Sequence, residues 1–204
     1  MLLLKGNLIN LRDWALSDLP DFTKWMQPEH EWHKYDGPYY PSATPEEVDL
    51  IAARRREMIL NNSFPSPRRS LAIVDASTDK LIGMVSWYWQ GEETNWISVG
   101  ICIYDPAFWN KGRGYEALGL WSEYLLTASP TLARLDLRTW SGNLRMMRLA
   151  EKLGYLQEAC FRKARIVNGD YYDGMGYGIL REEWQERYPN GFAACLHGSF
   201  LRGL

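Results

Sequence analysis

Among the features of this sequence, a glycine-rich turn between an apolar strand and a helix limits the possible folds the most. The run Val99–Pro106 has the character of a strand end, and Trp109–Ala117 begins a helix after glycines at positions 112 and 114. The first N–H groups of a helix have no internal partner, and the helix dipole adds roughly half a positive charge there. Glycines let an anion approach this backbone closely. The turn therefore predicts a phosphate site, with Lys111 and Arg113 adding charge at the same edge.

The position of the turn excludes two other kinds of glycine-rich phosphate site. A dinucleotide-binding fold places the turn after its first strand, with an acidic residue about 20 positions further on. A P-loop continues into Gly-Lys-Ser/Thr. Neither arrangement occurs here. From this segment alone, the alternative is an ordinary loop whose glycines only make a turn.

Hydrophobic periodicity and turn residues predict a mixed fold of the α+β class. The predicted strands are Leu8–Trp14, Ser70–Asp75, Leu81–Gln90, Trp96–Tyr104, Ala133–Trp140, Tyr155–Val167 and Tyr171–Leu180. The predicted helices are Ser17–Met26, a segment from the capping box at Thr44 to about Asn61, Tyr115–Ala128, and a segment opened by Asn143 and closed by Gly154. Three central strands form an antiparallel meander, strand and helix then alternate, and Asn168-Gly169 turns a final hairpin.

Length and composition favour one globular domain. The 204 residues are 46% apolar, which is enough for one sizeable core, so we expect a single domain over residues 1–204 with its core at about 8–188 and a tail at 189–204. A net charge of −2 gives no positive field for nucleic acid. Nucleic acid is therefore not an expected partner.

The cysteines and the first residues indicate where in the cell the protein is expected and whether it binds a metal. Three cysteines without close spacing suit neither a disulfide framework nor a zinc site, so we expect a cytoplasmic protein without a metal. The opening Met1–Leu4 run is broken by Lys5 and Gly6, and no apolar stretch approaches the length of a membrane span. We therefore expect no membrane partner.

The order of these segments resembles the GNAT acyltransferase superfamily, in particular the branch similar to the RimJ/RimL ribosomal-protein N-terminal acetyltransferases. The resemblance covers nearly the whole chain. It rests on Leu11-Arg12 with Asp18-Leu19, Leu81-Ile82-Gly83, the Val99–Ala117 block, Asn143 with Glu151–Tyr155, and Gly169, Tyr171, Asp173, Tyr177 and Glu183-Trp184. It implies a mostly antiparallel central sheet flanked by helices, with a bulge near Gly100 that opens a V-shaped cleft.

The resemblance also implies acetyl-CoA as the cofactor. Its pyrophosphate would meet the backbone N–H groups of the Trp109–Gly114 turn, and its pantetheine arm would lie in the cleft. The implied cofactor-binding residues are Ile101, Ile103, Trp109, Asn110, Lys111, Gly112, Arg113, Gly114, Tyr115, Asn143 and Met146.

Three positions depart from the family pattern. Trp109 stands where many members have Gln or Arg, and Met146 stands where a small residue is usual. Ala150 occupies the position of a tyrosine that in many members protonates the departing thiolate. A non-catalytic acyl-CoA-binding module is therefore the alternative to an acetyl-CoA-dependent N-acyltransferase.

The chemistry requires a neutral amine that attacks the thioester carbonyl. Near neutral pH roughly 1 lysine-like amine in 2,500 is neutral, against roughly 1 α-amine in 10, so an α-amine needs a base far less. Candidate bases are Glu92, Glu93, Asp105 and Asp173, together with His30 and His33. Each also has an ordinary structural explanation as a solvated turn residue or a hydrogen-bond acceptor.

The acceptor is expected to be a primary amine, small or peptidic, with a protein N-terminus favoured over a polyamine or amino sugar. Its candidate pocket residues are Trp32, Tyr39, Ser86 and Tyr88, although aromatic residues at such spacings also pack in cores. The tail contains four apolar residues that are expected to be buried, either against the chain's own domain or in a homodimer: Phe192, Leu196, Phe200 and Leu201.

Overall fold

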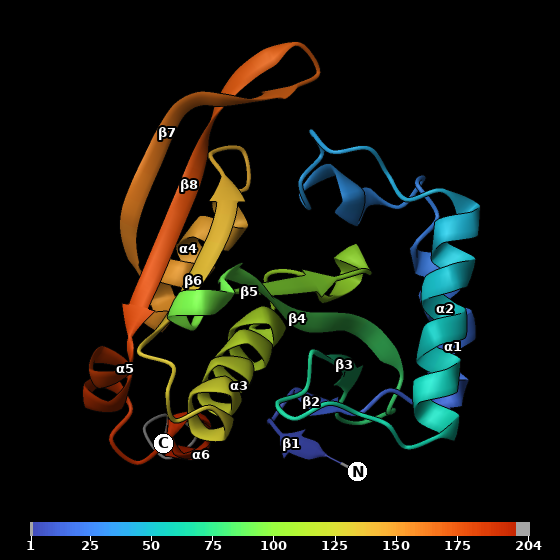
Figure 1. Ribbon diagram of the computed structural model, residues 1–204, viewed down its shortest axis with the longest axis horizontal. Coiled ribbons are helices and arrows are strands. Elements are labelled where there is room, and N and C mark those ends of the chain that lie inside the picture. Colours follow the sequence, from blue (N-terminus) through green and yellow to red (C-terminus); the bar gives the residue numbers. More distant parts are fainter. Residues whose placement is uncertain (1, 199–204) are drawn as a thin grey trace.

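A computed structural model describes residues 2–198. Its centre is an eight-stranded sheet in the order β1-β2-β3-β4-β5-β6-β8-β7 (Figure 1). Neighbouring strands are antiparallel, except that β5 and β6 are parallel. The strands are β1 Leu3–Lys5, β2 Ile9–Arg12, β3 Ser70–Asp75, β4 Leu81–Gly91, β5 Trp96–Ile103, β6 Arg134–Trp140, β7 Leu156–Val167 and β8 Asp170–Leu180. The predicted α+β fold with a mostly antiparallel sheet is confirmed.

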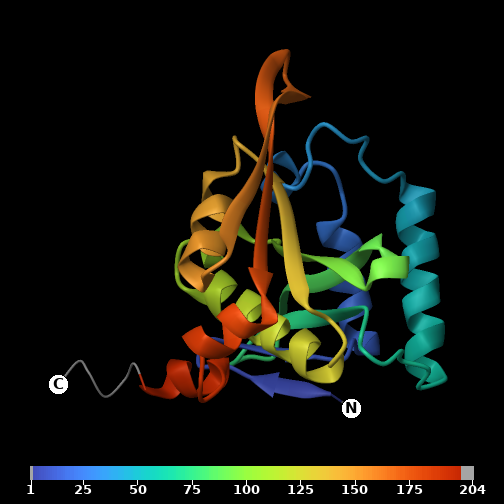
Figure 2. The ribbon, with the colours of Figure 1, turned by 60° about the vertical axis from the view of Figure 1, so that its left-hand side comes forward.

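Helices cover both faces of the sheet (Figures 1 and 2). The helices are α1 Leu19–Trp25, α2 Pro45–Leu60, α3 Arg113–Ala128, α4 Leu144–Leu153, α5 Arg181–Arg187 and α6 Phe192–Gly198. On β3, Leu71 and Ile73 belong to the core that includes α3, whereas Ala72 and Val74 belong to the core that includes α1 and α2. Alternate side chains of a strand point to opposite faces, so β3 is apolar throughout because both of its faces are covered.

Local sequence signals set the ends of several elements. The Thr44 hydroxyl accepts from the Glu47 N–H at 3.3 Å, and the Glu47 carboxylate accepts from the Thr44 N–H at 2.8 Å, so the predicted capping box opens α2. Asn168 and Gly169 have φ angles of 52° and 89°, as a two-residue hairpin turn of this twist requires. The predicted hairpin of β7 and β8 forms and extends beyond the rest of the sheet (Figure 2).

The structure also departs from the sequence-based expectations. It adds β1 before the predicted first strand, and it adds α5 and α6 after β8. The ladder between β4 and β5 shifts register between Trp89 and Gly91, whereas Gly100 pairs regularly with Ser86. The bulge expected near Gly100 is therefore absent from this ladder, because β4 stays in register along that part of β5.

The first part of the tail is covered by its own chain. Phe192 and Leu196 are buried, and the Phe192 ring packs on Tyr115 and Tyr188. Gly119 of α3 makes room for this ring, because a Cβ at that position would lie 2.0 Å from Phe192 Cζ. The other two tail residues that the sequence analysis named, Phe200 and Leu201, lie outside the described residues.

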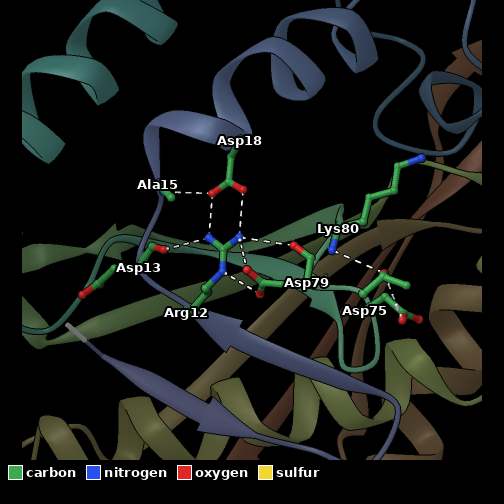
Figure 3. A network of polar contacts seen from close by, with 8 residues as sticks. Arg12, Asp13, Ala15, Asp18, Asp75, Asp79 and Lys80 are labelled. Carbon is green, nitrogen blue, oxygen red and sulfur yellow. Dashed lines mark hydrogen bonds and ion pairs between the residues drawn. The ribbon is translucent and has the colours of Figure 1, made fainter.

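A buried ion pair fixes the passage from β2 into α1. The Arg12 guanidinium donates to both Asp18 oxygens, at 2.7 and 2.9 Å, and to Asp79 Oδ1 at 3.1 Å (Figure 3). Asp18 Oδ2 also accepts from the Ala15 N–H at 2.8 Å. The side chains of Arg12 and Asp18 are only 8% and 4% exposed, so the buried Asp18 carboxylate depends on Arg12 for compensation.

We expect Arg12→Ala to destabilise the fold by about 3–5 kcal/mol, because it leaves the Asp18 carboxylate buried without its partner. Urea denaturation measures this loss. The control is Asp79→Asn, whose side chain is 69% exposed and whose loss should cost less than about 1 kcal/mol. Equal losses for the two variants would contradict this account.

Candidate active site

Strands β5 and β6 are paired only near their beginnings. The parallel ladder joins Ile97–Val99 to Leu135–Leu137. Beyond it, β5 continues to Ile103 against β4, and β6 continues to Trp140 against β8 (Figure 1). The two strands therefore diverge in a V, as the family resemblance implies, because each follows a different neighbour rather than because of a bulge.

The start of α3 lies just beyond the free end of β5. A short turn, η4 (Pro106–Phe108), leads to Asn110 and Gly112, which have φ angles of 58° and 82°. The Glu116 N–H donates to the Gly112 carbonyl at 3.1 Å, so the N–H groups before residue 116 precede the helical ladder. This is the arrangement that the predicted phosphate site requires.

Gly114 lies where α3 faces α4 and β5. A Cβ at Gly114 would lie 3.5 Å from Leu149 Cδ2 on α4 and 3.8 Å from Ile103 Cδ1 on β5, so the glycine faces the space between these elements. Ile101 of β5 and Met146 of α4 are partly buried against the same core. An apolar lining that ends at unpaired N–H groups suits a slender pantetheine arm joined to a phosphate.

The two cations next to the glycines differ in their partners. Lys111 is exposed. The Arg113 guanidinium instead pairs with Asp75 Oδ2 at 3.0 Å and lies over the Phe108 ring. Hydrogen bonds from Ser77 and Arg113 lower the pKa of Asp75 to about 2. The charge that Arg113 was expected to add at the edge of the site is therefore compensated, and the pair ties the start of α3 to the end of β3.

Two further residues of the α3 start are engaged within the fold. Glu116 is buried, and its carboxylate accepts from the Leu8 N–H at 2.8 Å, so it holds the β1–β2 turn. Tyr115 packs on Phe192. Burial raises the pKa of Tyr115, which keeps its phenol protonated. The side chains of Glu116 and Tyr115 thus serve the packing of α3.

The loop of residues 27–42 joins the two sides of the V. The Tyr35 carbonyl accepts from Trp140 Nε1 at 3.0 Å and from Asn143 Nδ2 at 3.1 Å. Asn143 Oδ1 in turn accepts from the Met146 N–H at 3.1 Å, which caps α4 as predicted. On the other side, the Trp109 ring meets the Tyr35 ring edge-on, with 5.5 Å between centroids. Both polar groups of the Asn143 side chain thus have partners within the protein, and its contact with pantetheine stays a prediction.

The structure does not bring the four candidate carboxylates together. Glu92 and Glu93 are exposed in η3 (Glu92–Thr94), at the opposite end of β5 from the start of α3. Asp105 Oδ1 accepts from the Ala107 N–H at 2.8 Å, and Asp173 Oδ1 accepts from the Lys163 N–H at 2.8 Å. Asp105 thus caps the turn η4, and Asp173 of β8 bonds across the hairpin to the irregular part of β7.

The candidate histidines lie in the 27–42 loop. His30 Nε2 is 2.9 Å from the Lys24 carbonyl oxygen. The His33 ring stacks on Trp32 with 3.7 Å between centroids. Burial lowers the pKa of His33, so its imidazole is neutral at neutral pH. A role of His30 or His33 as the general base stays a prediction.

The four candidate pocket residues differ in exposure. Trp32 is 7% exposed, packs on Tyr104 and donates to the Trp25 carbonyl, so its assignment to the acceptor pocket is corrected to the core. Tyr39 is half-buried beside the Arg165 guanidinium. Ser86 and Tyr88 share one face of β4. Tyr88 is exposed, so Tyr39, Ser86 and Tyr88 stay candidates for acceptor contacts.

A charged cluster on β6 was not predicted from the sequence. Asp136 is buried and pairs with Arg134 at 2.6 Å and Arg138 at 3.2 Å. Ser98 of β5, opposite Asp136, is also buried, and its hydroxyl has no hydrogen-bond partner among the described residues. The Arg-Leu-Asp-Leu-Arg alternation was the available signal, because residues two apart share one face of a strand.

Other features of the described residues lie outside this site. A cavity of about 300 Å³ lies at the other end of α3, lined by Trp87, Trp89, Ile97 and Leu132 among others. Within residues 2–198, none of the helices combines the length and apolar character needed to cross a bilayer. The same residues hold no group of three His, Cys, Asp or Glu side chains arranged to bind a metal.

Comparisons with known proteins agree with this architecture. A family model described as "Acetyltransferase (GNAT) domain" matches residues 9–156. The uncharacterized N-acetyltransferase YnaD of Bacillus subtilis is 31% identical over 147 residues, which cover 72% of this chain and 81% of YnaD. The SPbeta prophage-derived uncharacterized N-acetyltransferase YokL of the same organism is 25% identical over 109 residues, which cover 53% of this chain but only 60% of YokL.

Among solved structures, the fold is similar to that of RimL, a ribosomal L7/L12 alpha-N-protein acetyltransferase solved in complex with coenzyme A. The TM-score is 0.67 at 15% identity, with 88% of this chain and 98% of RimL covered. At that identity the likeness concerns the fold alone.

The family match and the similarity to YnaD show that the chain belongs to the GNAT acetyltransferase family. It is an N-acetyltransferase, and acetyl-CoA is the cofactor of this family. The resemblance inferred from the order of the sequence motifs is confirmed.

We expect Gly114→Val to weaken CoA binding by about tenfold or more, because its branched side chain would occupy the space between α3, α4 and β5. Isothermal titration measures the affinity. The control is Gly114→Ala, whose methyl group would make only ordinary contacts with Leu149 and Ile103 and should leave binding intact. Unchanged affinity of the valine variant would show that the cofactor does not occupy this space.

We expect the Asp75 interactions to stabilise the fold above the ordinary aspartate pKa and to be lost as the pH falls through about 2. Asp75→Asn should therefore flatten the acid dependence of stability, measured as the urea midpoint between about pH 6 and about pH 2. Asp49→Asn, at an exposed position of α2, should keep the wild-type dependence. Identical acid profiles for Asp75→Asn and the wild type would contradict this role.

Proposed function

We propose that this enzyme transfers an acetyl group from acetyl-CoA to a primary amine, and that a protein N-terminal α-amine is favoured over a polyamine or amino sugar. The observation that carries the acceptor choice is the engagement of Asp105 and Asp173 in backbone hydrogen bonds. Carboxylates that accept backbone hydrogen bonds are poorly placed to take a proton from an amine. An acceptor that is already partly neutral in water suits such a site.

The fraction of neutral amine differs strongly between the two kinds of acceptor. Near neutral pH roughly 1 α-amine in 10 is neutral, against roughly 1 lysine-like amine in 2,500. For the α-amine, alignment with the thioester carbonyl supplies most of the required help. The fold similarity to RimL, which acts on a protein α-amine, supports the same choice.

The divergence of β5 from β6 supports the placement of the cofactor arm. Past Val99, one edge of β5 has no strand partner, so backbone N–H and C=O groups along that edge face the V. The amides of pantetheine can pair with such an edge as another strand would. In this arrangement the arm follows β5 toward Gly100, and its phosphates lie at the start of α3.

One feature of α4 bears on how the departing thiolate gains its proton. Ala150 is fully buried and Met146 is partly buried, so neither position supplies a proton donor. Because the chain is an N-acetyltransferase by its family match, the non-catalytic acyl-CoA-binding module that the sequence left open is not favoured.

We expect acceptor-dependent release of CoA thiol from acetyl-CoA with peptides that carry a free α-amine. Matched peptides with a blocked N-terminus and an internal lysine should react at least about tenfold more slowly near neutral pH, because far less of their amine is neutral. The rate with the free α-amine should rise with pH as that amine loses its proton. Spermidine and an aminoglycoside complete the panel.

Faster turnover of the lysine peptide, spermidine or the aminoglycoside would contradict the acceptor choice. Micromolar binding of acetyl-CoA without release for any acceptor would favour the binding module.

A further inference from the structure

The Arg145 guanidinium contacts two aromatic rings next to the proposed phosphate site. The Arg145 guanidinium carbon lies 4.4 Å from the centroid of the Tyr35 ring and 4.4 Å from the centroid of the Trp109 ring. Arg145 is in the first turn of α4, and Trp109 immediately precedes the glycine turn that opens α3. The guanidinium therefore lies between the beginnings of the two helices that follow β5 and β6.

Both aromatic partners are held in place. Trp109 Nε1 donates to the Ile103 carbonyl at 2.8 Å, which fixes the indole against the end of β5. The Tyr35 carbonyl accepts from Trp140 and Asn143, which fixes the backbone of the loop against β6 and α4. A guanidinium that lies over an aromatic ring keeps N–H donors at its edges, where a planar or tetrahedral anion can meet them. The contacts with Tyr35 and Trp109 thus orient Arg145 before any ligand binds.

Arg145 has no anionic partner among residues 2–198. The ion pairs of the described residues do not include it, and the residue is exposed. Arg113, the arginine closest to the glycines in sequence, is compensated by Asp75. CoA brings a pyrophosphate and a 3′-phosphate to this end of the V, and such anions are favoured by charge-assisted hydrogen bonds from arginine. Like Lys111, Arg145 takes part in none of the ion pairs of the described residues.

We infer that Arg145 binds a phosphate of the CoA moiety, and that Tyr35 and Trp109 hold its guanidinium in the binding orientation. This inference rests on the cofactor site proposed above. It adds a ligand from α4 to the backbone N–H groups of α3, so that both sides of the V hold the same cofactor.

The test compares the affinities of Arg145→Gln and of the wild type for CoA, dephospho-CoA and pantetheine, with calorimetry for the first two and NMR titration for the weaker third. We expect about tenfold weaker binding of CoA by the variant and unchanged binding of pantetheine, which has no phosphate. A loss that disappears with dephospho-CoA identifies the 3′-phosphate as the partner, and a loss shared by both nucleotides identifies the pyrophosphate.

Arg56→Gln is the matched control, because Arg56 is exposed on α2 and its removal changes the net charge equally. It should bind CoA like the wild type. Arg145→Lys keeps the charge without the planar fork, and we expect an intermediate affinity for CoA.

Unchanged CoA affinity of Arg145→Gln, or an equal loss with pantetheine, would overturn the inference. Failure of the wild-type protein to bind CoA would instead overturn the cofactor site itself.

Discussion

Strands β5 and β6 are hydrogen-bonded through residues 97–99 and 135–137 and then follow different neighbours. Parallel strands need a crossover connection, which here contains α3, so the chain must leave β5 at its carboxyl end and return to start β6. Buried apolar residues of both strands and of α3 hold this short ladder together. Because α4 follows β6 in the same way, the starts of both helices meet the diverging strand ends, where ligands bind in open sheets with parallel strands.

Many of the polar side chains near the V form hydrogen bonds and ion pairs that stabilise the fold around the start of α3. Arg113 pairs with Asp75, Glu116 accepts from the Leu8 N–H, and Asp105 caps the turn before α3. Each of these bonds fixes one side of the segment whose N–H groups would meet the phosphates. Fixed donors need no reorganisation when a charged ligand arrives, which is the advantage of a preorganised site. The same bonds withdraw these charged groups from proton transfer, which agrees with the proposed α-amine acceptor, since part of that amine is already neutral near neutral pH.

Sequence patterns predicted the elements that carry local signals. The cap at Thr44, the turn at Asn168-Gly169 and the cap at Asn143 involve residues only a few positions apart, and all three formed as predicted. The order of the motifs also identified the family. These features depend on short-range hydrogen bonds and backbone preferences, which a sequence expresses directly.

Features that depend on distant segments were not predicted. The end of the β5–β6 ladder is set by register between strands more than 30 residues apart, and the Asp75–Arg113 pair joins residues 38 positions apart. Trp32 was placed in a pocket because aromatic spacing does not distinguish a lining residue from a core residue, whereas packing on Tyr104 does. No sequence pattern indicated a binding role for Arg145, because its two aromatic partners come from a loop and from the turn before another helix.

The central claim is that CoA binds at the start of α3. Backbone amide chemical shifts recorded during a CoA titration test it directly, because they report on the N–H groups that would meet the phosphates. The account predicts that the largest changes fall on the amides of Asn110–Tyr115. Changes centred instead on the cavity beside Trp87 and Trp89, with the amides of Asn110–Tyr115 unaffected, would contradict it.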